Sequence, residues 1–145
     1  MNTQQLQQYM LMDPYIRQYY GGVISSDQLP LVVKKPTVYI VNTDPSWLPG
    51  EHWVTFFMDT VCEQFDSSGI APRKEFETFL IAYGPNYKFN TKRVQDYDTD
   101  TCGLYCLMYA YFRCRGYSFD DFINMFKDNL SVNEIIVKYF YSNTS

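Results

Sequence analysis

The chain has 145 residues, and 46% of them are hydrophobic, so residues 1–145 are predicted to form one domain with its own apolar core. Aromatic residues make up 19% of the chain, a content that excludes intrinsic disorder. Lys and Arg number 12 against 16 Asp and Glu, and the resulting net charge of −4 argues against binding to nucleic acid.

The first half of the chain predicts one helix followed by three strands. Leu6 and Met10 recur at helical spacing within residues 3–12, and Pro14 ends the pattern. Small residues at 21–27 predict a loop. The runs rich in β-branched and aromatic residues predict strands at 37–41, 52–58 and 60–65, with the last two joined in a hairpin.

The middle of the chain alternates between a helix and short extended segments. Pro72 marks the start of the helix, and Gly84-Pro85 ends it. One short strand is predicted at 87–89 and a second at 93–95.

The last third of the chain predicts three helices, which gives an α+β fold overall. Residues 102–115 are apolar on almost every side, so this helix is expected at the centre of the domain. A Ser at 118 begins the next helix. Ser131 and Glu134 have the spacing of a capping box for the last one.

Cys102 is the first candidate for chemistry, because it stands at the start of the buried helix. The positive end of the helix dipole favours a thiolate there, and the thiolate is the nucleophilic form of cysteine. The carboxylates of Asp98 and Asp100 oppose that effect. A small apolar core residue is the alternative interpretation of such a cysteine.

His52 is the only histidine in the chain, so any imidazole chemistry must use it. In the predicted hairpin, Asp66 lies on the strand beside it, where a carboxylate can orient the ring. The alternatives are a surface histidine and a turn-forming aspartate. Gln95 is a further candidate, because a side-chain amide can donate a hydrogen bond to an oxyanion, although a lone Gln carries no signal.

The order of these four residues resembles the adenain family of adenovirus-type maturation proteases, and most of all its virophage and Polinton-type transposon branch. The pattern Gln95-x6-Cys102-Gly103 carries most of the resemblance, which covers roughly residues 20–115. The other matching segments are Ile40-Val41-Asn42-Thr43, Gly50-Glu51-His52-Trp53 and Cys62-Glu63-Gln64-Phe65-Asp66.

The resemblance implies a papain-like cysteine peptidase with a permuted order of catalytic residues and a central helix packed on a small mixed or antiparallel sheet. It implies Cys102 as nucleophile, His52 as general base and acid, Asp66 as the orienting carboxylate and Gln95 as the oxyanion donor. Adenain has Glu at the acidic position, whereas this chain has Asp66. A papain order is excluded, because no His follows Cys102.

The family also implies an endopeptidase that cuts capsid and core precursor proteins near Gly during virion maturation. We therefore expect the protein in the virion and the host cell interior, as a monomer without a membrane segment. Reduced cysteines fit that location. Adenain is activated by DNA and a viral peptide, but the acidic sequence supports no DNA binding and identifies no activating peptide, so no cofactor is expected.

Two alternatives stay open. A deconjugating protease for SUMO or ubiquitin-like modifiers shares the same four residue types. A structural zinc module would use Cys62, Cys102 and Cys106 with His52, although these spacings match no zinc-finger pattern.

Overall fold

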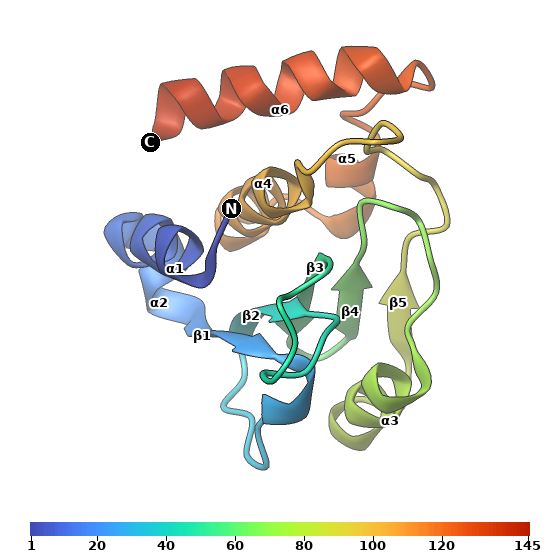
Figure 1. Cartoon of the computed structure of the whole chain (residues 1–145). Helices are drawn as coiled ribbons and strands as arrows, with labels where there is room; N and C mark the ends of the chain where they lie inside the picture. The colour runs from blue at the N-terminus through green and yellow to red at the C-terminus, as the bar shows by residue number, and fades with distance from the viewer.

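A computed structural model describes all residues, 1–145, and shows one mixed sheet with helices on both of its faces (Figure 1). The strands lie in the order β1-β2-β3-β4-β5. The elements in chain order are α1 (Thr3–Met12), α2 (Pro14–Tyr19), β1 (Tyr20–Ser25), η1 (Ser26–Gln28), β2 (Thr37–Asn42), β3 (Trp53–Met58), β4 (Cys62–Phe65), α3 (Lys74–Tyr83), β5 (Tyr87–Phe89), α4 (Cys102–Cys114), α5 (Phe119–Ile123) and α6 (Leu130–Thr144).

The three central strands run antiparallel, and each edge strand is parallel to its neighbour. The pair of Met58 with Cys62 closes the β3–β4 hairpin, as the sequence predicts. This hairpin brings the start of β3 and the end of β4 side by side, at one end of these two strands. Residues 52 and 66 lie at that end.

The two faces of the sheet bury separate apolar cores. The larger core joins β2, β3 and β4 to α1, α2, α4, α5 and α6, and its centre is the fully buried pair Tyr105 and Tyr109 of α4. The smaller core packs α3 on the opposite face through Phe76, Phe79 and Leu80. Helix α4 is buried on most sides, as predicted, because it lies between the sheet and the other helices.

The expectation of a loop at Gly21-Gly22 is wrong, because both residues belong to β1. A Cβ built on Gly21 would lie 2.4 Å from the ring of Tyr39 and 2.6 Å from the hydroxyl of Thr37. The absence of a side chain at position 21 therefore leaves room for the Tyr39 and Thr37 side chains of β2, and the pairing register shifts between Tyr20 and Gly22. Glycine marks such a site within a strand here rather than a turn.

Two further expectations are corrected. Residues 93–95 form a loop, because the N–H groups of Val94 and Gln95 both donate to the carbonyl of Ser67 instead of joining a ladder. The N-cap of α6 is Asn129, which accepts a hydrogen bond from the Ser131 N–H. Glu134 is thus free of a capping role.

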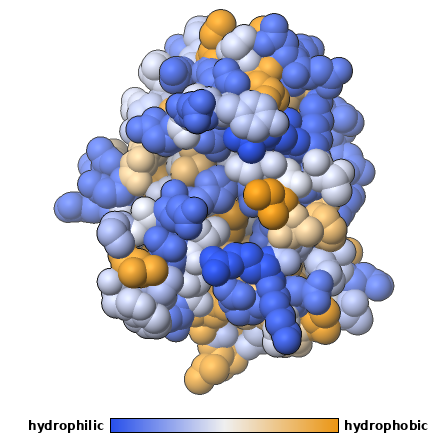
Figure 2. Space-filling view, turned by 45° about the vertical axis from the view of Figure 1, so that its right-hand side comes forward, coloured by the Kyte–Doolittle hydropathy of each residue, from blue (hydrophilic) through white to orange (hydrophobic).

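On the face that Figure 2 shows, the exposed apolar side chains are dispersed. Figure 2 shows small hydrophobic patches separated by hydrophilic side chains, with one apolar protrusion at the lower edge, where Figure 1 places the loop between η1 and β2. That loop carries Leu31 and Val32, which are both strongly exposed. None of the helices is long and apolar enough to cross a membrane.

Candidate active site

The imidazole of His52 and the carboxylate of Asp66 form the centre of the site. His52 directly precedes β3 and Asp66 directly follows β4, and the distance from His52 Nε2 to Asp66 Oδ1 is 2.7 Å. The hairpin therefore brings the two side chains into direct contact, as the sequence analysis expects. With Nε2 held by the carboxylate, the other ring nitrogen, Nδ1, is left for a second partner.

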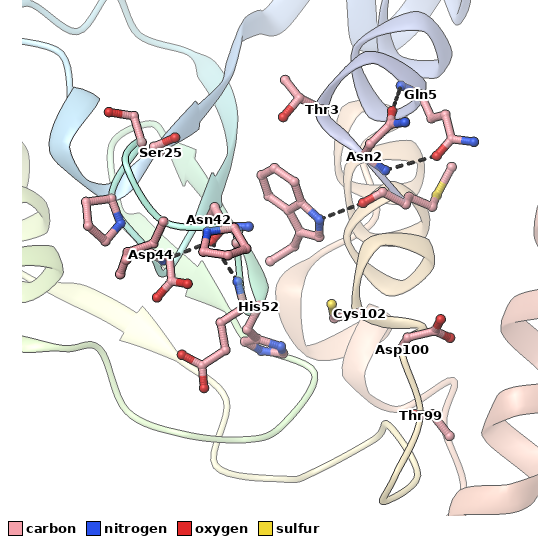
Figure 3. Close-up of a pocket in the computed structure, with 18 of the residues that line it drawn as sticks. Asn2, Thr3, Gln5, Ser25, Asn42, Asp44, His52, Thr99, Asp100 and Cys102 are labelled. Atoms are coloured by element: carbon pink, nitrogen blue, oxygen red, sulfur yellow. Dashed lines mark hydrogen bonds between the residues drawn. The ribbon is translucent and has the colours of Figure 1, made fainter.

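The backbone around His52 is fixed by the end of β2. The carbonyl of His52 accepts a hydrogen bond from the Thr43 N–H at 2.8 Å. The side-chain oxygen of the buried Asn42 accepts from the N–H groups of Asp44 at 2.8 Å and Glu51 at 3.2 Å. One amide thus ties together both ends of the loop that leads into His52 (Figure 3).

Asp66 is held by a buried asparagine that the sequence analysis does not identify. The Asp66 N–H donates to Asn90 Oδ1 at 3.0 Å, and Asn90 Nδ2 donates to the Asp66 carbonyl at 2.6 Å. The Ser68 N–H donates to the same carboxylate oxygen that binds His52, at 2.8 Å. These bonds fix the position of the carboxylate before any substrate binds.

Cys102 is the first residue of α4, and its sulfur points into the space between α1 and His52 (Figure 3). Burial raises the pKa of the Cys102 thiol, but the neighbouring His52 ring and the backbone N–H groups of Trp53 and Gly103 outweigh it, so the net pKa is lowered. The start of a helix also stabilises a thiolate. Cys102 is therefore predisposed to be an anion.

The pKa of His52 moves in the opposite direction. Burial lowers the pKa of the ring, but the bond to Asp66 and the interaction with Cys102 raise it to a net value of about 10. A raised imidazole pKa and a lowered thiol pKa favour proton transfer from sulfur to nitrogen. The pair is thus set up as a thiolate and an imidazolium, which is the reactive state of a cysteine nucleophile.

Gln95 lies in the same cleft, and its amide is fully bonded. Its oxygen accepts from Ser67 Oγ at 2.6 Å, while its nitrogen donates to the carbonyl and the hydroxyl of Thr99 at 3.1 and 3.0 Å. Ser67 follows Asp66 directly, so consecutive residues hold the imidazole and the amide. An oxyanion would have to replace one of the two Thr99 oxygens as acceptor.

His52, Gln95 and Cys102 line a cleft of about 650 Å³, whereas Asp66 contacts His52 without lining that cleft. One wall is the start of α1, with Asn2, Thr3 and Gln5, and the other is the loop between β2 and β3, with Asp44 (Figure 3). Its charged side chains besides His52 are three carboxylates, those of Asp44, Glu51 and Asp100.

The other cysteines have no such environment. Cys62, Cys106 and Cys114 are buried and free, and burial raises the pKa of each thiol. No group of three or more His, Cys, Asp or Glu side chains is placed to hold a metal ion, so the zinc-module alternative has no site.

The fold resembles that of a viral protease. A crystal structure of the ASFV pS273R protease matches with a TM-score of 0.55 at 21% sequence identity, over 74% of this chain and 55% of that one. A selenomethionine crystal structure of the same protein gives a TM-score of 0.47 at 27% identity, over 72% of this chain and 45% of that one. The chain thus spans about half the length of that protease. No protein-family model matches the sequence, and no curated protein matches it.

This likeness supports the predicted fold class, an α+β domain with a buried central helix on a small mixed sheet. The structure brings all four predicted site residues together, Cys102, His52, Asp66 and Gln95. The sequence does not predict the supporting role of four further residues, Asn42, Ser67, Asn90 and Thr99. The signals at Asn42 are a polar residue at the end of an apolar strand, which also fits a turn, and its place in the segment Ile40-Val41-Asn42-Thr43 that resembles the adenain family, and neither assigns it a role.

Proposed function

We propose that the protein is a cysteine endopeptidase in which Cys102 is the nucleophile. The observation that carries this proposal is the His52 ring, which lies between the Asp66 carboxylate and the Cys102 thiol at the start of a buried helix. This is the nucleophile, base and orienting group of acyl transfer. The fold shared with the ASFV pS273R protease supports the same function.

In the proposed reaction, the Cys102 thiolate attacks the scissile carbonyl while His52 carries the thiol proton. The oxyanion is held by the Gln95 amide and the backbone N–H of Cys102. His52 then gives its proton to the leaving amine, and a thioester remains on the sulfur. A water molecule that gives a proton to the same imidazole attacks the thioester, and the acid product leaves as the thiol is restored.

The sequence resemblance to the adenain family extends the proposal to the substrates. These are capsid and core precursor polypeptides with small residues such as Gly near the cut, in the virion or the infected cell. We propose in addition that the chain belongs to the virophage and Polinton-type branch of that family. The cleft of about 650 Å³ beside Cys102 is the place where such a polypeptide substrate would bind.

The test is to treat the purified chain with a vinyl sulfone peptide that ends in Gly-Gly and to map the modified residue. We expect the label on Cys102 and hydrolysis of a fluorogenic peptide of the same sequence. Cys102→Ala abolishes both, while Cys114→Ala, a change at a buried thiol, keeps both. A Cys102→Ala protein that still cuts contradicts the proposal. Cleavage of a ubiquitin-like Gly-Gly fusion but not of a capsid precursor favours a deconjugating protease instead.

A further inference from the structure

Two buried polar side chains at the start of α6 point toward the segment that joins Gln95 to Cys102. Asn133 is fully buried and donates from Nδ2 to the carbonyl of Val94 at 3.0 Å. Glu134 is the next residue and is also buried. A buried carboxylate is costly unless its oxygens accept hydrogen bonds, so its partners show what it holds in place.

Glu134 accepts hydrogen bonds from both ends of this segment. At one end, the Asp96 N–H donates to Oε2 at 3.2 Å. At the other end, Thr101 Oγ1 donates to Oε1 at 2.8 Å, and Tyr105 OH, one turn into α4, donates to Oε2 at 2.5 Å. Asp96 follows Gln95, and Thr101 precedes Cys102. One carboxylate therefore connects the neighbours of the two proposed oxyanion donors.

The tip of the segment has little other support. Tyr97, Asp98 and Asp100 are exposed, and Asp98 adopts a positive φ of 55°. The remaining bonds at the tip are local, such as Thr99 Oγ1 to the Asp96 carbonyl at 2.8 Å. Gln95 itself is also held by Ser67. The hydrogen bonds that tie Asp96 and Thr101 to a residue outside the segment and α4 both go to Glu134.

We infer that Glu134 is a positioning residue, which holds the Gln95 amide and the Cys102 N–H at the separation that an oxyanion requires. The inference rests on the proposed function. A donor must lie within hydrogen-bond distance of the position that the oxyanion takes, so a shift of the loop reduces its effect. Reactivity of the thiolate itself does not need these donors and depends on His52 and Asp66.

Four variants isolate the role. Glu134→Ala removes all three acceptor bonds. Glu134→Gln can keep a hydrogen bond to each of the three partners. Its oxygen can accept from Asp96 and Tyr105, and its NH₂ can donate to the Thr101 hydroxyl, which reverses the direction of that one bond. Thr101→Val removes only one bond, in case Glu134→Ala does not fold. Glu63→Gln is the matched control, since Glu63 is an equally buried carboxylate that binds Tyr109 and Arg113 farther along α4.

Three readouts are compared: hydrolysis of the fluorogenic Gly-Gly peptide, alkylation of Cys102 by iodoacetamide, and amide hydrogen exchange of residues 95–101. We expect Glu134→Ala to lower kcat about 10²-fold, as a displacement of about 1 Å does, with KM and the alkylation rate within about 3-fold of wild type. Amide exchange in the segment becomes faster. Thr101→Val changes kcat and exchange in the same direction but less, whereas Glu134→Gln and Glu63→Gln keep kcat within about 3-fold.

Several outcomes overturn the inference. One is a Glu134→Ala protein with wild-type kcat and wild-type amide exchange at residues 95–101. If Glu134→Ala does not fold, the same result in Thr101→Val overturns the inference. Another is a loss of alkylation equal to the loss of kcat, because it places the effect on the nucleophile. A third is a Glu134→Gln protein as impaired as Glu134→Ala. If the wild-type chain itself does not cut the peptide, the proposed function fails, and amide exchange alone decides whether Glu134 holds the segment.

Discussion

The Nε2 atom of His52 and the Oδ1 atom of Asp66 are 2.7 Å apart, although the two residues belong to different strand ends. The same carboxylate oxygen accepts the Ser68 N–H at 2.8 Å. Because Asp66 is positioned through its own backbone by Asn90, the imidazole is oriented by a group that cannot easily move. This contact fixes which ring nitrogen is available to Cys102.

Replacement of Asp66 separates ring orientation from charge. Asp66→Asn still offers an oxygen to Nε2, as the asparagine of Cys-His-Asn proteases does, so we expect kcat within about 10-fold of wild type. Asp66→Ala leaves the ring without a partner, and we expect kcat to fall by at least about 10²-fold. Steady-state kinetics at several pH values check both. Equal losses in the two variants would contradict an orienting role for the side chain.

The two shifted pKa values predict a window of pH for the reactive ion pair. The pKa of Cys102 is lowered, so this thiol loses its proton at a lower pH than an ordinary thiol. His52 keeps its proton up to its pKa of about 10, so the ion pair exists from the lowered thiol pKa up to about pH 10. Alkylation of Cys102 by iodoacetamide should therefore rise at a lower pH than for a free thiol. The observed midpoints belong to the coupled pair.

His52→Ala is the control for this pH dependence. Without the imidazolium, burial is the larger influence on the thiol, and the alkylation midpoint should move to higher pH. An unchanged midpoint in this variant would show that His52 does not interact with Cys102.

The elements with a strong local signal are predictable from the sequence. Helix α4 is apolar on nearly every side, and the β3–β4 hairpin carries runs rich in β-branched and aromatic residues around a short turn. The hairpin alone is enough to predict the contact between His52 and Asp66. The α+β class follows from the order of these elements.

The predictions that are wrong or missing concern residues whose role depends on contacts with residues far away in the sequence. Ser131 and Glu134 fit a capping box in spacing, but Asn129 caps the helix and Glu134 reaches Thr101, 33 residues away in sequence. The same holds for Asn90, whose partner Asp66 lies 24 residues away. Local patterns contain no information on such pairs, because the sheet and α6 create the contacts only once the chain is folded.

Gln95→Ala tests the proposed oxyanion donor. We expect kcat to fall by about 10²–10³-fold, which is the usual loss on removal of one such donor. Alkylation of Cys102 should stay near the wild-type rate, because Gln95 contacts Ser67 and Thr99 rather than the thiol. Gln95→Glu serves as the matched variant of similar shape, and it should be equally impaired since a carboxylate cannot donate. Full activity of either variant would exclude the amide from the reaction.

The absence of a side chain at Gly21, where β1 pairs with β2, gives a prediction on stability alone. Gly21→Ala places a methyl group against the Tyr39 ring and the Thr37 hydroxyl, so we expect a loss of about 1–3 kcal/mol in the free energy of unfolding. Gln7→Ala, on the exposed side of α1, is the control and should change stability by less than about 0.5 kcal/mol.

A second change in the same contact tests the cause of that loss. If Gly21→Ala destabilises through the Tyr39 ring, then in a Tyr39→Ala background the added methyl group should cost clearly less, because the ring that it meets is gone. Urea unfolding of the two single variants and the double variant measures this coupling. Additive losses would mean that the methyl group acts through the Thr37 hydroxyl, the other close contact, instead. The kcat per folded molecule should stay unchanged throughout, because Gly21 lies at the start of β1 and the cleft touches that strand only at Ser25, its other end.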